Sequence, residues 1–371
     1  MDLKEELLEY AKKIGIDDLK VTSAQPLSEA KAVLKEAKQK GYLSKFVKSD
    51  LDLITDPKQT LAEAKSVIVC ALSYRVARPK IDKQTLKDEL RGRLARFARG
   101  RDYHQVFDQK LEQLLNFLKQ QGATGVKFVD TGPTVDRALA KRAGIGWQGK
   151  NCSIIHPEYG SWIFIGGIIT DLDLAIDQPL KAGCKDCNRC ITACPTNALK
   201  EPYLLDSEKC LGYITLKKGY LTLAERKSIG MRLWGCDSCQ QVCPANQGII
   251  SGRNKAFSVD KEEAYPDLTK ILTLDKAEYK KRFKDTALYW RGMRPLKRNA
   301  AVILGNLKDE AALSYLLEAL EDNKPIVRAH AAWALGELGD KNVEQKLKRA
   351  LAREKKKDVK KEINTILAEK F

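Results

Sequence analysis

The sequence has no apolar run long enough to cross a membrane. Its longest such runs, Ser66 to Tyr74 and Trp162 to Thr170, fall far below the roughly 20 residues that a membrane-spanning helix needs, and they favour buried strands. An export signal is lacking too, because the stretch from Met1 to Val21 is charged throughout and predicts an amphipathic helix. We therefore expect a cytoplasmic protein that does not enter a membrane.

Acidic residues are scarce relative to basic ones. Lys and Arg number 66 against 49 Asp and Glu, which gives a formal charge of +17. Such an excess favours a polyanionic partner, although solubility alone explains it equally well. Aromatic residues make up only 7% of the chain and no RNA-recognition signature is present, so the sequence adds nothing further in favour of nucleic acid.

Three consecutive segments differ in their pattern. Up to about Asp173, strand-like runs alternate with helical patterns, which predicts an α/β or α+β domain. A cysteine-rich segment follows, and from about Leu268 the pattern is entirely helical. The domains expected from these changes are an N-terminal domain over 1–178, a ferredoxin-like domain over 179–265 and an all-α domain over 266–371.

The helical segment contains an internal repeat. Ala301-Val-Ile-Leu-Gly-Asn-Leu307 recurs as Ala332-Trp-Ala-Leu-Gly-Glu-Leu338, which is typical of HEAT-type paired helices. The stretch from 341 to 371 predicts one last, strongly basic helix. Basic helical repeats suit long anionic ligands, and a solvated face without a ligand is the alternative.

The ten cysteines indicate metal binding, since a chain without an export signal is expected to keep its thiols reduced. One run has the spacing C-x2-C-x2-C-x3-C and is followed by Pro195, as in bacterial ferredoxins, where three thiolates bind one 4Fe-4S cluster and the fourth reaches a second cluster. A second motif, which ends before Pro244, has only three cysteines, and the isolated Cys210 supplies the missing ligand.

These spacings predict two 4Fe-4S clusters with interleaved ligands. Cluster one takes Cys184, Cys187, Cys190 and Cys243, and cluster two takes Cys194, Cys210, Cys236 and Cys239. A pair of zinc sites is the alternative, but it explains neither the successive three-residue steps nor the proline after each terminal cysteine. Cys70 and Cys152 lie in apolar, strand-like sequence and are expected to be buried and structural.

Several blocks, taken in order, resemble the epoxyqueuosine reductase family over essentially the whole chain. They are Asp130-Thr-Gly-Pro133, Asp136-Arg-Ala-Leu-Ala-Lys-Arg-Ala-Gly-Ile-Gly-Trp147, Gly149-Lys-Asn151, the two cysteine motifs, Tyr289-Trp-Arg-Gly292 and the terminal repeat. The resemblance implies a cobalamin-dependent oxidoreductase, related to reductive dehalogenases, that reduces epoxyqueuosine to queuosine in tRNA. Another cobalamin-dependent reductase and a non-catalytic electron carrier or tRNA-binding module are the alternatives.

The resemblance also implies roles for individual residues. It makes Asp130 the proton donor, and we expect a partly desolvated carboxyl there with a raised pKa; the alternative is that Asp130 only ends a strand and caps a turn. Asp102 matches a second block near the substrate. The polar residues on blocks that would hold the cobalamin are Arg137, Lys150, Asn151 and Ser153.

The chain has only three histidines and lacks a D-x-H-x2-G motif, so we expect cobalamin to be held without a protein imidazole. An external low-potential donor would reduce the clusters, which in turn would reduce the cobalt; whether a cobalt-carbon bond forms stays open. The tRNA partner would present its anticodon stem-loop to a monomer, with phosphate contacts from the repeat region and from Arg291, Arg294, Lys297 and Arg298.

The segment from Gly144 to Asn151 nearly matches the phosphate-binding P-loop motif. Asn151 stands where that motif needs a magnesium-binding hydroxyl, and the segment follows a helix and leads into a strand, which is the wrong order. We therefore reject nucleoside triphosphate hydrolysis. The glycines are instead expected to let the backbone approach a flat ligand closely.

Overall fold

In the computed structural model, residues 2–48, 50–76, 81–340 and 342–371 are described. They form two compact units, each assembled from separate stretches of chain: unit 1 comprises 1–77, 101–210 and 237–258, and unit 2 comprises 78–100, 211–236 and 259–371. The cysteine-rich segment is shared between the units, so the three consecutive domains expected from the sequence stay a prediction.

Unit 1 is built on a four-stranded sheet in the order β1-β2-β7-β4, in which every neighbouring pair is antiparallel. The strands are β1 (Asp18–Ser23), β2 (Ser66–Ser73), β4 (Gly125–Val129) and β7 (Ile163–Thr170). β2 is buried along its whole length, which explains its continuous apolar sequence. The strands predicted near residues 66 and 162 are therefore confirmed.

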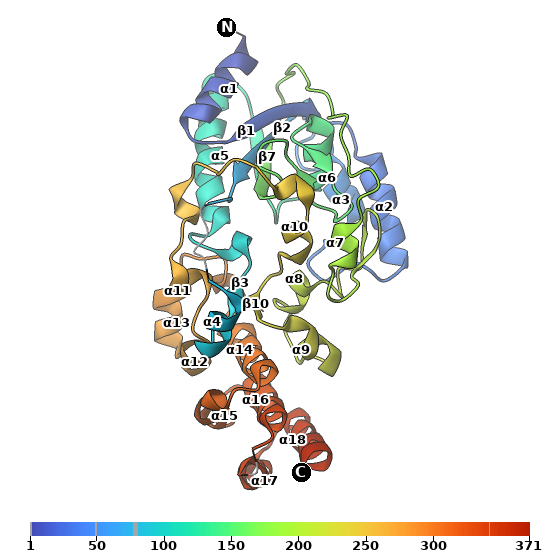
Figure 1. The fold of residues 1–371 in the computed structure, drawn as a ribbon. Helices are drawn as coiled ribbons and strands as arrows, with labels where there is room; N and C mark the ends of the chain where they lie inside the picture. Colours follow the sequence, from blue (N-terminus) through green and yellow to red (C-terminus); the bar gives the residue numbers. More distant parts are fainter. Residues whose placement is uncertain (1, 49, 77–80, 341) are drawn as a thin grey trace. The chain divides into compact units, whose positions relative to one another are not determined.

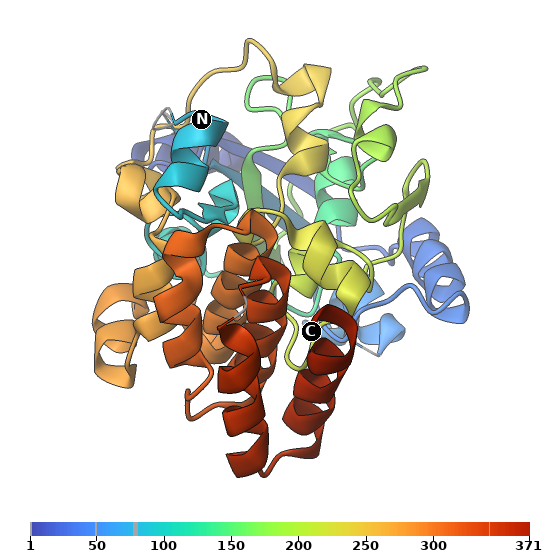
Figure 2. The same ribbon diagram turned by 60° about the horizontal axis from the view of Figure 1, so that its bottom comes forward.

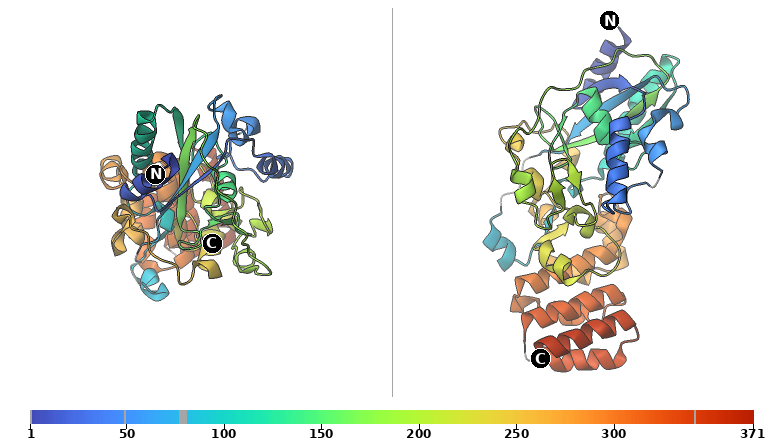
Figure 3. Two further views of the ribbon diagram at one scale, coloured as in Figure 1. Left: turned by 90° about the horizontal axis from the view of Figure 1, so that it is seen from above. Right: turned by 90° about the vertical axis from the view of Figure 1, so that its right-hand side faces the viewer.

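Helices cover both faces of this sheet (Figures 1 and 3). On one face α5 (Tyr103–Gln120) packs against β4 and β7, beside α1 (Leu3–Lys13). On the other face α6 (Asp136–Ala143) packs its Leu139, Ala140 and Ala143 against alternate residues of β2. The remaining elements of unit 1 are α2 (Ser28–Gln39), α3 (Leu51–Thr55), η1 (Pro57–Gln59), β5 (Trp147–Gln148), β6 (Ile154–Ile155), α7 (Arg189–Thr192), β8 (Leu199–Glu201), β9 (Leu204–Leu205), α10 (Ser238–Gln241), η3 (Pro244–Asn246) and η4 (Lys255–Phe257).

The single amphipathic helix predicted at the start of the chain is wrong in its length. Asp2 and Glu5 form a capping box that begins α1, and the helix ends at Lys13. Gly15, in a left-handed conformation, follows, and β1 then begins at Asp18. This strand was missed because Asp18–Ser23 is short, polar and at the sheet edge.

Unit 2 is mainly helical, and its C-terminal helices pack side by side (Figures 2 and 3). They are α12 (Leu268–Thr273), α13 (Lys276–Phe283), η5 (Tyr289–Arg291), α14 (Met293–Leu307), η6 (Glu310–Ala312), α15 (Leu313–Ala319), α16 (Pro325–Leu338), α17 (Val343–Arg353) and α18 (Lys357–Lys370). The last basic helix predicted from the sequence is in fact two helices, and residue 341 of that prediction lies outside the described residues. The other elements are α4 (Lys83–Asp88), β3 (Arg93–Leu94), η2 (Arg96–Ala98), α8 (Leu211–Ile214), α9 (Leu223–Ile229), β10 (Arg232–Trp234) and α11 (Lys261–Ala264).

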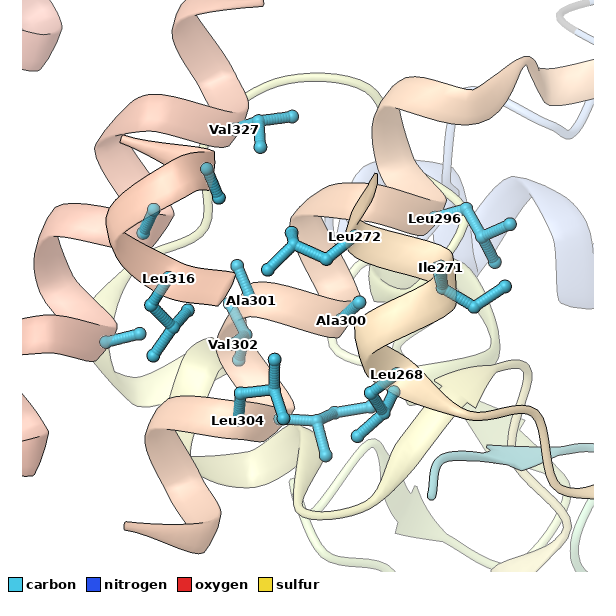
Figure 4. Close-up of a cluster of buried hydrophobic side chains, with 14 of the residues drawn as sticks. Leu268, Ile271, Leu272, Leu296, Ala300, Ala301, Val302, Leu304, Leu316 and Val327 are labelled. Atoms are coloured by element: carbon cyan, nitrogen blue, oxygen red, sulfur yellow. The ribbon is translucent and has the colours of Figure 1, made fainter. Parts of the chain in front are cut away.

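The internal repeat corresponds to a repeated helix contact. A Cβ on Gly305 of α14 would lie 2.8 Å from the Cα of Ala334 on α16, and a Cβ on Gly336 of α16 would lie 2.5 Å from Ile366 on α18. The same glycine of each copy thus admits the next helix at close range. Around the first contact, α12, α14, α15 and α16 share one apolar core (Figure 4).

Two basic residues of α14 are structural, which corrects the prediction that they bind phosphate. Arg298 is fully buried and donates to the backbone carbonyls of Lys217 and Gly219 at 2.8 Å each, and to that of Ile214 at 3.2 Å. Lys297 is buried in an ion pair with Asp322 at 2.5 Å. Charged groups in an apolar core need such partners, and these two are unavailable to a nucleic acid.

Arg298 and its neighbour Asn299 join the segment after α8 to strand β10. The Asn299 amide donates to the carbonyl of Thr215 at 2.8 Å and to that of Leu233 at 2.9 Å. Thr215 follows helix α8, which begins directly after Cys210, and β10 ends two residues before Cys236. Helix α14 therefore fixes the backbone next to two cysteines that the sequence assigns to cluster two.

We expect the replacement Arg298→Met to lower the free energy of unfolding by about 3 kcal/mol. Methionine fills much of the same space but leaves several buried carbonyl groups without a donor, and hydrogen bonds to charged groups contribute about 1.5 to 3 kcal/mol each. Chemical denaturation followed by circular dichroism measures the loss. Arg294→Met on the same helix is the control, because Arg294 is exposed and its replacement should leave stability unchanged.

No helix in the described part of the chain is long and apolar enough to cross a membrane.

Candidate active site

Asp130 occupies a strained turn between β4 and α6. Its φ is +48°, a region that favours glycine but that aspartate tolerates better than most residues. The Thr131 N–H donates to the Val129 carbonyl at 2.5 Å, which closes a tight turn around Asp130. The Asp130 side chain is 60% exposed, so a ligand can reach it. Strain of this kind is typical of functional sites.

Residues at the start of α5 surround the Asp130 carboxylate. The Tyr103 hydroxyl donates to Asp130 Oδ2 at 2.7 Å, and His104 Nε2 lies 3.5 Å from the same oxygen. Tyr103 is fixed by stacking on Phe164 of β7, with ring centroids 4.2 Å apart and planes 7° apart. Tyr103 and His104, which are neighbours at the start of α5, thus both face the carboxylate of Asp130.

Asp102 completes the group from the other side of the imidazole. It caps α5 by accepting from the His104 N–H at 3.0 Å, and the same Oδ1 lies 2.9 Å from His104 Nδ1. The imidazole of His104 therefore lies between two carboxylates, that of Asp102 and that of Asp130.

The raised pKa expected for Asp130 is also wrong. Partial loss of water around this carboxyl would on its own raise its pKa, but the neighbouring His104 and the hydrogen bond from Tyr103 outweigh this and the pKa is lowered. The pKa of His104 is raised to about 9, because its contacts with Asp102 and Asp130 outweigh the burial that would lower it. At neutral pH the proton of this pair therefore resides on His104.

The carboxyl with a raised pKa is Asp136, at the start of α6. Burial raises its pKa to about 7, and a hydrogen bond from Thr134 offsets this only in part. Asp136 Oδ2 accepts from the Asp130 N–H at 2.9 Å. Asp136 therefore secures the turn that presents Asp130.

The polar residues predicted to hold a cofactor cluster around the β5–β6 hairpin. Asn151 and Ser153 lie in its loop, where the Ser153 N–H donates to Asn151 Oδ1 at 3.2 Å. Arg137 of α6 donates to the Cys152 carbonyl at 3.0 Å. Among the described residues, the buried Nδ2 of Asn151 and Nε1 of Trp147 have no hydrogen-bond partner. Unpaired buried donors are costly, so their presence fits a ligand with amide or carbonyl acceptors.

Two glycines of this region are needed by the protein backbone, and their expected role in approaching a flat ligand stays a prediction. A Cβ on Gly144 would lie 2.3 Å from the Gln178 carbonyl oxygen, and one on Gly146 would lie 2.4 Å from that of Ile155. The rejection of a P-loop is confirmed, because the segment forms a β-hairpin loop between β5 and β6 and does not open a helix.

The cysteines assigned to cluster one lie close together in unit 1. Helices α7 and α10 pack against each other near the two motifs. Burial raises the pKa of the Cys243 thiol, and the Cys184 and Cys187 thiols raise it further. Burial likewise raises the pKa of Cys190, with contributions from Cys184 and Cys243. Thiols that belong to different motifs and lie more than 50 residues apart in sequence are therefore mutual neighbours.

Backbone amides point at two of the sulfurs. The Lys150 N–H donates to Cys184 Sγ at 3.4 Å, and the Ala198 N–H donates to Cys194 Sγ at 3.2 Å. Burial would raise the pKa of Cys194, but backbone N–H groups in the loop that follows it lower the pKa overall. Such amides stabilise a thiolate, which is the form that binds iron.

The ligands assigned to cluster two are divided by the compact units. Cys194, Cys210 and Cys239 belong to unit 1, and Cys236 ends a stretch of unit 2, so their joint ligation stays a prediction. Among the described residues, no three Cys, His, Asp or Glu side chains are arranged to hold a single metal ion. Cys70 and Cys152 are buried, as expected for structural thiols.

Two of the three histidines, His156 and His330, have both ring nitrogens engaged. His156 accepts from two backbone N–H groups at Nδ1 and faces Asp18 at 3.2 Å with Nε2. His330 is fully buried, with Nδ1 2.7 Å from the Ile326 carbonyl and Nε2 accepting from the Leu221 N–H at 3.2 Å. His104 Nδ1 is held by Asp102, while its buried Nε2 makes no hydrogen bond among the described residues, so the expectation that cobalamin is held without a protein imidazole stays a prediction.

Sequence reasoning missed Tyr103, His104 and Asp136. The block Gly100 to His104 was noticed only for Asp102, although the spacing of Asp102 and His104 at a helix start is itself a signal for a carboxylate–imidazole pair. The side chain of Lys150 pairs with Asn188 at 2.9 Å and its backbone N–H with Cys184, and its contact with a cofactor stays a prediction.

Three family models match the chain. The one described as "Epoxyqueuosine reductase QueG, DUF1730" matches residues 55–131. The one described as "4Fe-4S double cluster binding domain" matches residues 183–246, and "HEAT repeats" matches residues 294–368. The last two confirm the ferredoxin-type segment and the helical repeat predicted from the sequence.

Curated relatives and solved structures agree along the whole length. Epoxyqueuosine reductase of Bacillus subtilis (strain 168) is 40% identical over 364 residues, which cover 97% of this chain and 94% of the relative. A crystal structure of epoxyqueuosine reductase with a tRNA-Tyr epoxyqueuosine-modified stem loop is similar with 40% identity and a TM-score of 0.95, covering 99% of this chain and 98% of that one. A Bacillus subtilis structure, described as having its catalytic aspartate loop swung out of the active site, has 39% identity, a TM-score of 0.94 and the same coverage, 99% and 98%.

Proposed function

Since this chain belongs to the epoxyqueuosine reductase family of oxidoreductases, we propose that it reduces epoxyqueuosine in tRNA to queuosine. The reaction expels the epoxide oxygen as water and leaves a carbon–carbon double bond, so it consumes two electrons and two protons. The chain must therefore bring together an electron supply, a proton supply and a tRNA site.

The observation that carries the proposal is the exposed, strained Asp130 with its two partners on α5. Expelling an epoxide oxygen needs a proton at that oxygen, because a leaving alkoxide is otherwise too basic. Tyr103 and His104 hold the carboxylate in one orientation, and the turn leaves it open to a ligand. We assign Asp130 as the group that passes the proton to the oxygen.

The electron supply is proposed to be two 4Fe-4S clusters, for which the match to a double-cluster domain gives the family basis. For cluster one, support comes from the proximity of Cys243 to Cys184 and Cys187 and from the amide that points at Cys184. For cluster two, support comes from the sequence spacing of Cys194, Cys210, Cys236 and Cys239. An external low-potential electron donor would reduce both clusters again after each turnover.

Cobalamin is the proposed partner of the clusters, and the residues present fit it. The unpaired donors of Asn151 and Trp147 suit the amide side chains of a corrin, and Arg137 and Ser153 lie in the same region. When bound, cobalamin would supply a strongly reducing cobalt centre. The protein's own part is to bind this ring, to exclude water and to keep a proton at Asp130.

An anaerobic visible spectrum, recorded with and without added cobalamin, tests this cofactor set. We expect broad iron–sulfur absorbance in both samples and corrin bands that stay with the protein after gel filtration. A protein that kept its clusters but never retained the corrin would instead be an electron carrier, and the proposed reduction would be wrong.

The proposed partner is the anticodon stem-loop of a tRNA. The enzyme is proposed to act in the cytoplasm and as a monomer. The excess positive charge then has a use, since phosphate contacts dominate the affinity of RNA-binding proteins. With Lys297 and Arg298 buried, exposed basic residues of the repeat are better candidates. They include Arg294 and a group of lysines at the start of α18, Lys355, Lys356, Lys357, Lys360 and Lys361.

We expect the triple replacement of Lys356, Lys357 and Lys360 by glutamine to weaken tRNA binding about tenfold at physiological salt. The slope of log affinity against log salt should also fall by about 0.7 to 0.9 for each phosphate that the variant no longer neutralises. Fluorescence anisotropy with a labelled stem-loop at several salt concentrations measures both. Replacing Lys12, Lys13 and Lys38 removes equal charge from exposed positions of unit 1; an equal effect there would mean that only net charge matters.

A further inference from the structure

We propose that His104 is a positioning residue that stores the proton which Asp130 delivers to the epoxide oxygen, with Asp102 holding the imidazole in its doubly protonated form. The inference rests on the proposed function and deepens it, because it names the source of the proton. His104 itself is not placed against the substrate and acts only through Asp130.

The geometry supports a doubly protonated ring. Nδ1 faces Asp102 Oδ1 at 2.9 Å and Nε2 faces Asp130 Oδ2 at 3.5 Å, so a carboxylate oxygen lies opposite each ring nitrogen. A neutral imidazole has one nitrogen without a proton, and that lone pair would then face a carboxylate. Nε2 makes no hydrogen bond to any described residue, so its contact with Asp130 is electrostatic. An imidazolium places a positive charge beside both carboxylates and has a proton to give.

Among the described residues, the charged groups that act on the pKa of His104 are Asp102 and Asp130. Tyr103 stacks on the imidazole with centroids 4.0 Å apart, and its hydroxyl is committed to Asp130. On α6, the charged groups that act on this site are Asp136 and Arg137, which influence Asp130. On β7, Phe164 presents an apolar ring to Tyr103. The charges nearest to His104 are therefore both carboxylates.

Because the pKa of Asp130 is lowered, the proton that Asp130 delivers must come from another group. A carboxylate that is ionised at neutral pH carries no proton of its own, whereas an adjacent imidazolium with a pKa of about 9 does. Closing the site around a ligand removes water and disfavours the charged carboxylate, which draws the proton from His104 Nε2 to Asp130.

Electrons and protons balance in this scheme. Two electrons enter from the proposed iron–sulfur and cobalamin supply, both epoxide C–O bonds break, and the carbon–carbon double bond forms. One proton passes from His104 through Asp130 to the oxygen and leaves a neutral imidazole. The second reaches the oxygen from solvent through the same pair, and the oxygen departs as water.

The pH dependence of turnover follows from the sign of the two shifts. A store on His104 is filled below its pKa and empty above it, so the turnover rate at saturating tRNA should stay level from about pH 6 to pH 9 and fall above. If Asp130 supplied its own proton, the rate would fall throughout this range, because the pKa of Asp130 is lowered.

The variant His104→Gln keeps a side chain that can hydrogen-bond to Asp102 but cannot store a proton. We expect its turnover rate at pH 7 to be about 10²-fold lower and to keep falling as the pH rises, with no plateau. His156→Gln is the matched control, since His156 pairs with Asp18 elsewhere in unit 1 and should leave the profile unchanged. A level profile in His104→Gln like that of the parent protein would overturn the proposal.

A second measurement needs no turnover. With only three histidines, the full-length protein labelled on the imidazole nitrogens gives three pairs of NMR signals, one for each ring, and the His104 and His156 variants assign them. We expect His104 to titrate near pH 9 and its pKa to drop in Asp102→Asn. Titration near the ordinary value of about 6.5 would overturn the store while leaving the assignment of Asp130 and the proposed function intact.

Discussion

The replacement Asp130→Asn is expected to lower turnover of epoxyqueuosine tRNA by about 10³-fold, the usual range for losing a group that transfers a proton in the transition state. Asparagine tolerates the left-handed backbone at this position and still accepts the Tyr103 hydroxyl, so the turn should survive. What the variant loses is the ability to carry a proton. Single-turnover assays with prereduced protein, analysed by mass spectrometry of the nucleosides, measure the loss.

Two controls separate the chemistry from folding and from cofactor loss. Asp108→Asn makes the same change on the exposed side of α5, where Asp108 pairs with Lys127, and should leave turnover unchanged. Iron content and cobalamin retention of Asp130→Asn should match those of the parent protein. Full turnover in Asp130→Asn would remove Asp130 from the mechanism.

The interleaved cluster ligands predict an unusual pattern of iron loss. Cys243→Ala should leave about four of eight iron atoms per chain and abolish turnover, because cluster one loses a ligand. The double variant of Cys184 and Cys243 should also keep about four, since both cysteines serve one cluster. The double variant of Cys239 and Cys243 should keep none, since they serve different clusters. Iron and sulfide analysis under anaerobic conditions provides the numbers.

A sequential arrangement, with each motif holding its own cluster, makes the opposite prediction for the two double variants. Cys152→Ala is the matched control. Cys152 is a buried thiol whose pKa is raised in part by Cys190 and Cys210, and it is assigned to neither cluster. It should keep all of the iron. Loss of iron in this control would add Cys152 to the ligand set.

The parts that could be predicted from the sequence depend on local spacing. The cysteine motifs, the apolar runs of β2 and β7 and the repeated glycine of the HEAT-type helices each leave a periodic signal in the chain. β1 left no such signal, because an edge strand can be short and polar.

The parts that could not be predicted depend on which groups fold together. Lys297 and Arg298 look like phosphate ligands in sequence, and only the packing of α14 against the loop after Ile214 shows that they are buried. The sequence predicts the wrong direction for the pKa shift of Asp130, because that direction is set by Tyr103 and His104, which precede Asp130 by 27 and 26 residues. Burial alone would have given the expected direction.

The most direct test of the central claim is an anaerobic reaction of the purified protein with epoxyqueuosine tRNA, cobalamin and a low-potential reductant. We predict that the nucleoside loses one oxygen atom and becomes queuosine, and that omitting cobalamin or removing the iron stops the reaction. Epoxyqueuosine that remains unchanged while both cofactors are bound and reduced would contradict the account.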